Sequence, residues 1–196
     1  MKQKISFAFL LFIVVTQVQA QVTFRPGLRA GVNFSHFTEG DEYYSEDTNA
    51  EFTSKTDFYA GFYGALHLSR FYTLQPEVDY SRQGSVYQYT DDFGEDYSQK
   101  IDVSYLSIAV VNKFTFGEKF NVHIAPTMDF IVDKAKHLET ESDVDFGFVA
   151  GLGFNFTKNI GIEARIKKGI VPVVDNGDYH TNVVFSLGAA YTFDIK

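Results

Sequence analysis

The sequence contains no cysteine and no tryptophan among its 196 residues. Without cysteine the chain has neither a disulfide framework nor a thiolate metal site, and a lipoprotein anchor is excluded. Beyond residue 20 there is also no long apolar run, so we expect no transmembrane helix in that part. Basic residues are few, with 17 Lys and Arg against 25 Asp and Glu, and the formal net charge is −8. The phosphates of nucleic acid would repel such a chain, so we expect no nucleic-acid partner.

Residues 1–20 have the features of a secretory signal peptide. Lys2 and Lys4 precede an apolar run over 5–15, and Ala20 supplies a small residue at the end. A single membrane-anchoring helix is the alternative, but the run is shorter than the roughly 20 residues that such a helix needs. We therefore expect cleavage before Gln21, export, and one domain over residues 21–196.

The rest of the chain repeats one pattern, in which apolar side chains alternate with polar or small ones. In the last segment Phe185, Leu187 and Ala189 fall on one face, while Ser186 and Gly188 fall on the other. Side chains of a strand alternate between two faces, so each such segment is predicted to be an amphipathic strand. Eight segments show the pattern: 24–37, 57–69, 73–90, 100–116, 120–133, 144–157, 160–171 and 183–194.

The connections between these segments alternate between long and short. The long ones are 38–56, 91–99, 134–143 and 172–181, and the tight ones lie at 69–72, 117–119 and 158–159. Long outer loops, short periplasmic turns and an even strand number are typical of outer-membrane barrels. The fold class predicted is therefore all-β, an eight-stranded antiparallel up-and-down transmembrane β-barrel. A soluble lipocalin-like barrel in the periplasm has the same periodicity with the two faces exchanged, and it stays the alternative.

Aromatic residues near the strand ends favour the membrane, where they form belts at both interfaces. One expected belt, on the side of the short turns, comprises Phe71, Tyr72, Phe116, Phe120, Phe156, Tyr191 and Phe193. The other, toward the long loops, comprises Tyr87, Tyr105, Phe130 and Phe146.

Several strand motifs give the chain a resemblance to a known family. They are Leu74-Gln75-Pro76-Glu77-Val78-Asp79-Tyr80-Ser81 with Gly84, Tyr105-Leu106-Ser107-Ile108 running on to Lys113-Phe114, Ala125-Pro126, Phe146-Gly147 leading into Gly151-Leu152-Gly153, and Glu163-Ala164-Arg165. Over nearly all of residues 21–196 the sequence resembles PorT-like outer-membrane β-barrel proteins. The resemblance implies an eight-stranded barrel in the outer membrane of a Gram-negative bacterium. It implies no catalytic residue, and a link to protein secretion is associated with the family name.

Seven charged residues fall at mid-strand positions on the polar face: Arg29, Glu77, Asp79, Lys113, Asp129, Glu163 and Arg165. An eight-stranded barrel is wide enough only to be filled by side chains or to hold one small ligand. Buried charges must be paired, or they destabilise the fold. We therefore predict a lumenal salt-bridge network that fills the barrel. A narrow gated pore or a small-ligand pocket is the alternative.

No enzymatic constellation is recognisable. The histidines are His36, His67, His123, His137 and His180, and none joins a convincing Ser/His/carboxylate triad such as a lipid hydrolase at the rim would need. No Asp-x-Asp-x-Asp-Gly calcium loop is present, although acidic residues gather at 39–51 and 91–96. We expect no enzyme activity, no cofactor, and no catalytic, cofactor-binding or metal residues.

The function expected from the sequence is that of a non-enzymatic integral outer-membrane protein of structural or interaction type. It would act through its extracellular loops and would support secretion or envelope integrity. Its partners would be outer-membrane lipid and lipopolysaccharide, the barrel-assembly machinery during insertion, and an envelope protein. A porin-like narrow pore or small-ligand transporter is the alternative, and the soluble ligand-binding barrel is a further one.

Overall fold

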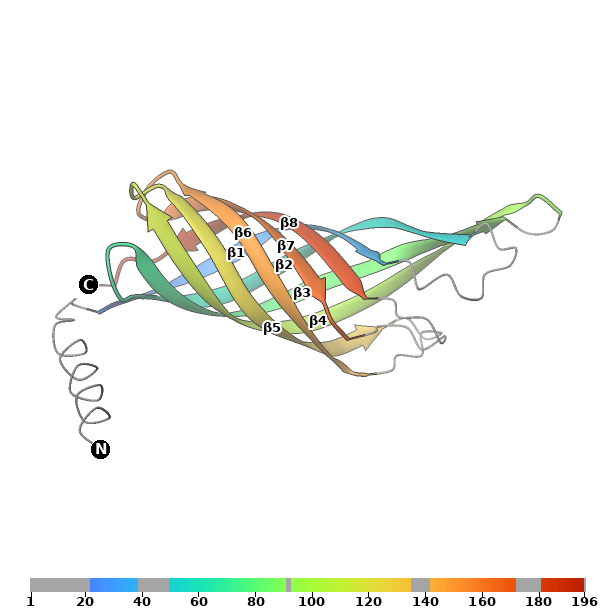
Figure 1. The fold of residues 1–196 in the computed structure, drawn as a ribbon, viewed down its shortest axis with the longest axis horizontal. Coiled ribbons are helices and arrows are strands. Elements are labelled where there is room, and N and C mark those ends of the chain that lie inside the picture. The colour runs from blue at the N-terminus through green and yellow to red at the C-terminus, as the bar shows by residue number, and fades with distance from the viewer. Residues whose placement is uncertain (1–21, 39–49, 91–92, 135–141, 172–180, 196) are drawn as a thin grey trace, which may run out of the picture.

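A computed structural model of the protein describes residues 22–38, 50–90, 93–134, 142–171 and 181–195 (Figure 1). The eight strands in this part are β1 (Thr23–Phe37), β2 (Ala50–His67), β3 (Tyr72–Thr90), β4 (Asp96–Phe116), β5 (Phe120–Lys134), β6 (Val144–Asn155), β7 (Ile160–Gly169) and β8 (Asn182–Thr192). No helix in the described ranges is long and apolar enough to cross a membrane. The predicted signal peptide, residues 1–20, lies outside the described residues.

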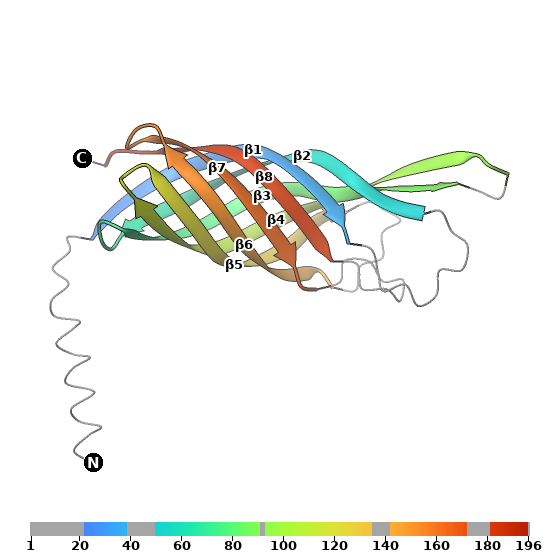
Figure 2. The ribbon, with the colours of Figure 1, turned by 45° about the horizontal axis from the view of Figure 1, so that its top comes forward.

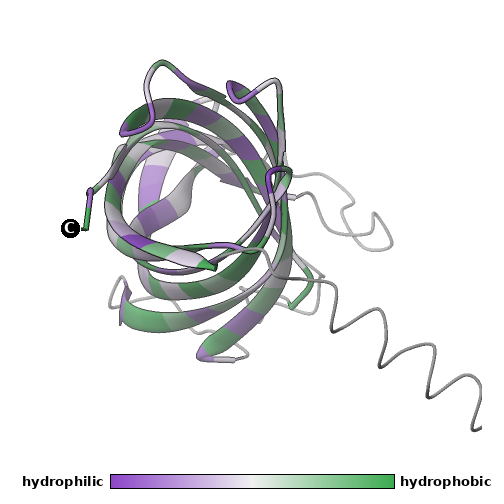
Figure 3. Cartoon of the chain, turned by 90° about the vertical axis from the view of Figure 1, so that its left-hand side faces the viewer, coloured by the Kyte–Doolittle hydropathy of each residue, from purple (hydrophilic) through white to green (hydrophobic). Residues whose placement is uncertain are grey.

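The strands form one closed antiparallel ring in the order of the chain. Each strand pairs with the next, and β8 returns to pair with β1 from Gly27↔Thr192 to Phe37↔Asn182. Figure 3 looks along the barrel and shows the closure. Because every strand has a partner on both sides over the barrel wall, backbone polar groups are satisfied there without water. The predicted eight-stranded antiparallel up-and-down barrel is confirmed.

The short connections and both described ends of the chain lie at one end of the barrel (Figures 1 and 2). The β4–β5 connection turns sharply because Gly117 and Glu118 both have positive φ, 57° and 65°, the conformation of a type I′ hairpin turn. We call this end the short-turn end and the opposite one the long-loop end.

A charged clasp follows β8 at the short-turn end. Arg25 contacts Asp194 at 2.6 Å and donates to the carbonyl oxygen of Lys158 at 3.0 Å, while the Lys158 ammonium lies 3.5 Å from Asp194. A hydrogen bond from Asn159, with the charges of Lys158 and Arg25, lowers the pKa of the Asp194 carboxyl. The clasp ties the last residues to β1 and to the β6–β7 turn.

The apolar face of the strands points outward and the polar face points inward. Phe62, Leu152 and Ile124 are 69%, 65% and 52% exposed, whereas Glu77 and His123 are each 1% exposed. The interior is therefore mostly polar, with two small apolar clusters among the described residues, one of Ala109, Val111, Ala125 and Val149 and one of Phe37, Val103 and Tyr105. A soluble barrel would have the reverse arrangement, so the structure decides between the two orientations that the sequence allowed.

The position of Tyr105 differs from the predicted one. We expected it in the outward aromatic belt, but it is completely buried in the lumen against Phe37 and Val103. Strict alternation with Ser107 already places Tyr105 on the inner face, and the β4–β5 register shift occurs just before it, between Ser104 and Tyr105. The inner face therefore carries an aromatic ring near the long-loop end.

Two strands begin earlier than the sequence pattern predicted. β2 begins at Ala50 instead of 57, and β4 begins at Asp96 instead of 100. Most of these residues are polar or charged, but they pair with the far part of β3, for example Glu51↔Gln88 and Asp96↔Thr90. Cross-strand pairing outweighs their weak local strand propensity. The result is a three-stranded extension beyond the barrel rim, visible in Figures 1 and 2.

Candidate functional site: the barrel lumen

The middle of the lumen is occupied by Arg29 of β1 and the side chains that surround it. The Tyr59 ring fits beside it because β1 and β8 carry glycines there, so that a Cβ on Gly188 would lie 2.0 Å from the Tyr59 hydroxyl oxygen. The guanidinium of Arg29 stands over this ring, 4.7 Å from its centroid, a cation–π contact. Small residues in the wall therefore make the room in which a ring and a guanidinium stack.

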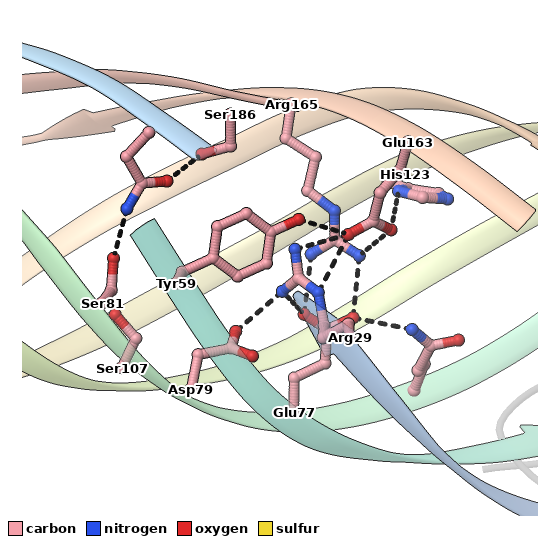
Figure 4. Close-up of polar contacts among 12 residues, drawn as sticks. Arg29, Tyr59, Glu77, Asp79, Ser81, Ser107, His123, Glu163, Arg165 and Ser186 are labelled. Carbon is pink, nitrogen blue, oxygen red and sulfur yellow. Dashed lines mark hydrogen bonds and ion pairs between the residues drawn. The ribbon is translucent and has the colours of Figure 1, made fainter. Parts of the chain in front are cut away.

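Two guanidiniums and three carboxylates form a continuous network around this point (Figure 4). Arg29 contacts Glu77 at 2.6 Å, Asp79 at 2.7 Å and Glu163 at 2.6 Å. Arg165 donates to both carboxylate oxygens of Glu77, at 2.7 and 2.9 Å, and to Glu163 at 2.9 Å. All five side chains are at least nine-tenths buried. The bonds are charge-assisted and partly bidentate, which makes them strong and geometrically specific.

A second polar layer lies closer to the long-loop end. Lys167 pairs with Asp129, which also accepts from Ser107, and Lys167 donates to Gln83 at 3.0 Å. Gln83 accepts a further bond from Asn182 at 2.5 Å. These bonds join strands β3, β4, β5, β7 and β8, so this layer holds opposite walls together as the central network does.

Both mouths of the described lumen are narrowed by side chains. At the long-loop end Phe37, Val103 and Tyr105 form a buried apolar cluster, at most 1% exposed. At the short-turn end the Tyr63 hydroxyl and Thr192 hydroxyl are 2.7 Å apart, and His67 and Thr73 share a 2.9 Å hydrogen bond. An ion that crossed the barrel would have to displace groups at several levels.

A cavity of about 60 Å³ separates the central network from the second polar layer. It is lined by charged and hydroxyl-bearing residues, among them Asp79, Ser81 and Thr127. One oxygen each of Asp79 and Thr127 is buried without a hydrogen-bond partner. Since a water molecule takes about 30 Å³ in the liquid, the cavity has room for about two waters, which is too little for an organic ligand.

The structure brings together five of the seven charged residues singled out from the sequence: Arg29, Glu77, Asp79, Glu163 and Arg165. Asp129 belongs instead to the second layer. Lys113 has no hydrogen bond or ion pair with any residue that the structure describes, and it lies between Thr73 and His123 in the sheet register. The prediction that Lys113 belongs to the salt-bridge network was therefore wrong.

Several participants were absent from the predicted set, among them Lys167 and Tyr59. Lys167 shares the inner face of β7 with Glu163 and Arg165, and its alternation predicted an inward position. Tyr59 likewise shares the inner face of β2. In both cases the period-two pattern gave the direction of the side chain, but it contained nothing about the partner across the lumen.

The described histidines do not assemble a catalytic site. His123 is buried, hydrogen-bonded to Asn121 through one ring nitrogen and 3.9 Å from Glu163 through the other, and His67 bonds Thr73. His137 and His180 lie outside the described residues. Within the described ranges no three His, Asp or Glu side chains are grouped so that they could hold a metal. Most of the acidic loop residues fall in the ranges not described.

Comparison with known proteins places these features in a family. Residues 19–175 match the family described as outer membrane protein beta-barrel domain. Among solved structures, Neisserial surface protein A is 11% identical, with a TM-score of 0.54 and coverage of 86% of this chain and 97% of the other. OprG from Pseudomonas aeruginosa is 12% identical, with a TM-score of 0.51 and coverage of 89% and 98%. These likenesses concern the fold alone. No curated protein matches the sequence.

Proposed function

The chain belongs to the family of outer membrane proteins with a β-barrel domain, and on this premise we propose that it is a non-enzymatic barrel that anchors an extracellular interaction surface. Members of this class place short turns and termini in the periplasm and long loops outside the cell. The short-turn end then faces the periplasm of a Gram-negative bacterium. The long-loop end, with the extension of β2, β3 and β4, projects from the cell.

The observation that carries the proposal is the self-contained filling of the lumen. Arg29 is bonded to Glu77, Asp79 and Glu163, and Arg165 is bonded to Glu77 and Glu163, so these bonds join β1, β3 and β7 across the barrel. Buried charges paired this well are costly to separate, because each ion would be left without its partner. A barrel whose walls are held together in this way is suited to support an extracellular interaction surface. The 60 Å³ cavity offers no room for a transported solute.

Finer aspects of the proposal come from the sequence. The motifs that resemble PorT-like proteins support a role in secretion or envelope integrity. The signal-like residues 1–20 support export and cleavage, followed by insertion through the barrel-assembly machinery. Outer-membrane lipid would cover the apolar wall, and lipopolysaccharide or an envelope protein would contact the outer end.

Single-channel recording of the purified full-length barrel in a planar bilayer tests this function. We expect no conductance steps above leak from the wild-type protein. The double variant Arg165→Ala with Glu77→Ala opens the central layer while removing equal and opposite charge, so it is the matched variant that would assign any conductance to the lumen. Regular steps from the wild-type barrel, with a size changed by the variant, would refute the closed lumen and favour the narrow pore.

A further inference from the structure

The outer wall of the barrel has a groove of about 550 Å³ where β8, β1 and β2 lie side by side. Its floor is a row of small side chains that face outward in register: Ala189, Ala30 and Ala60. The next row toward the short-turn end has large side chains that form one side of the groove: Tyr191, Leu28 and Phe62. The groove therefore results from three alanines that lie next to one another across the strands.

The groove faces the hydrocarbon layer of the membrane, because it belongs to the apolar outer face of the barrel. An unfilled space there would deprive the lining of dispersion contacts, and acyl chains are the molecules that surround this wall. The volume of the groove equals that of about eighteen waters at about 30 Å³ each, which is the scale of a whole acyl chain. Its size and lining therefore suit one hydrocarbon chain.

The end of the groove nearest the short turns is positively charged. There the groove reaches Ile160, the first residue of β7, and the turn just before it carries Lys158, whose side chain is 75% exposed. The Arg25 guanidinium donates to the carbonyl oxygen of Lys158 at 3.0 Å, so it lies at the same place. Against these two cations the described part of the clasp has the single carboxylate of Asp194. One net positive charge remains, which attracts an anionic headgroup.

This charge also argues against a second copy of the chain as the occupant. Two barrels that met at this groove, both with the short-turn end on the same side of the membrane, would bring two positively charged ends together. A lipid with a negative headgroup meets the same surface with the opposite charge. The apolar groove and the charged end are therefore both matched by an anionic phospholipid.

We propose that this groove binds an anionic phospholipid of the periplasmic leaflet. One acyl chain lies along Ala189, Ala30 and Ala60, and the phosphate lies beside Lys158 and Arg25. The bound lipid covers the seam between β8 and β1 at which the barrel closes. This inference rests on the proposed function, because a short-turn end in the periplasm meets phospholipid, whereas lipopolysaccharide occupies the outer leaflet.

The test uses the full-length protein in phosphatidylcholine vesicles, with lipid contact measured by the quenching of tryptophan fluorescence. The sequence has no tryptophan, so Phe62→Trp in the groove and Ile124→Trp on the opposite wall each supply a single fluorophore. Both native side chains face outward and are more than half exposed. Phosphatidylglycerol with brominated chains is added in increasing fractions, and brominated phosphatidylcholine is the reference. At position 62 we expect phosphatidylglycerol to be preferred about fivefold, the effect of one net charge near a lipid surface, and at position 124 we expect no preference.

Two variants, each with a matched control, separate the site from general effects. In the Phe62→Trp background, Lys158→Gln removes the net charge and Ala30→Leu fills the floor, so either change should reduce the fivefold preference to about one. Lys119→Gln, in the β4–β5 turn, should leave the preference unchanged. So should Ala150→Leu, at an outward position between Ile124 and Ile166 in the register. All four variants are first checked for a folded barrel by the difference in gel migration with and without boiling, and Lys158→Gln, at an exposed turn, tests the site without changing the wall.

Several results would overturn the inference. Equal quenching by the two brominated lipids at position 62, or an equal preference at position 124, would exclude recognition of the headgroup at this site. A preference that persists in Ala30→Leu would exclude the groove as the place of the acyl chain. Absence of quenching at position 62 by either lipid would show that a second copy covers the groove. A barrel that is closed in bilayer recordings but shows no lipid preference refutes only this inference, whereas conductance steps refute the proposed function.

Discussion

Replacing Arg165 by methionine should destabilise the barrel much more than replacing Glu77 by glutamine. Both side chains lie in the same network, and both are buried. The network holds two guanidiniums and three carboxylates. Without Arg165, three carboxylates surround Arg29 alone, and an uncompensated buried charge costs about 3–5 kcal/mol. The glutamine at position 77 leaves two charges of each sign and one oxygen that can still accept, so the loss is about 1–3 kcal/mol.

The assay is urea unfolding in phospholipid vesicles, followed by the migration difference between folded and unfolded protein on an unboiled gel. The double variant Arg165→Met with Glu77→Gln should be less unstable than the sum of the single variants, with a coupling energy of about 0.5–3 kcal/mol, since the two residues are in direct contact. Two results would contradict this reasoning. One is a larger loss of unfolding free energy for Glu77→Gln than for Arg165→Met, and the other is a loss in the double variant equal to the sum of the two single losses.

Three further changes test other parts of the barrel. Leu152→Arg places a charge on the lipid-facing wall and should cost about 2–4 kcal/mol near the bilayer midplane in the same urea assay, while Leu152→Phe should cost little; an unchanged midpoint for the arginine variant would contradict the outward orientation. Gly188→Val should lower the folded yield because its side chain would occupy the position of the Tyr59 hydroxyl, and the yield should recover partly with Tyr59→Ala. The Asp194 carboxyl has a pKa that is lowered in the folded state, so the contribution of the clasp is present above the ordinary carboxyl range and lost as the pH falls through the lowered value. The protection of the Phe193 amide, measured relative to its intrinsic exchange rate, should fall there in the wild type, and Asp194→Asn should abolish this change in protection.

The sequence alone determined the direction of nearly every strand side chain. Alternation has a period of two residues, so a short stretch such as Val183 to Phe193 already separates the two faces, and closely spaced turn residues separate the strands. This local information predicted eight strands, antiparallel order and the inward position of the charged residues. It also predicted Glu163 and Arg165 on one face, since they are two residues apart.

Only the closed structure decided which of these inward charges meet. Arg29 contacts Glu163 across 134 positions of sequence, and Glu77 contacts Arg165 across 88. Such pairs depend on the stagger between strands and on ring closure, which no local pattern contains. For the same reason Asp129 pairs with Lys167 instead, and Lys113 remains outside the network. The three-stranded extension beyond the barrel rim also depended on tertiary structure. Its polar residues become strand because β3 offers them a pairing edge, and their own sequence shows little preference for a strand.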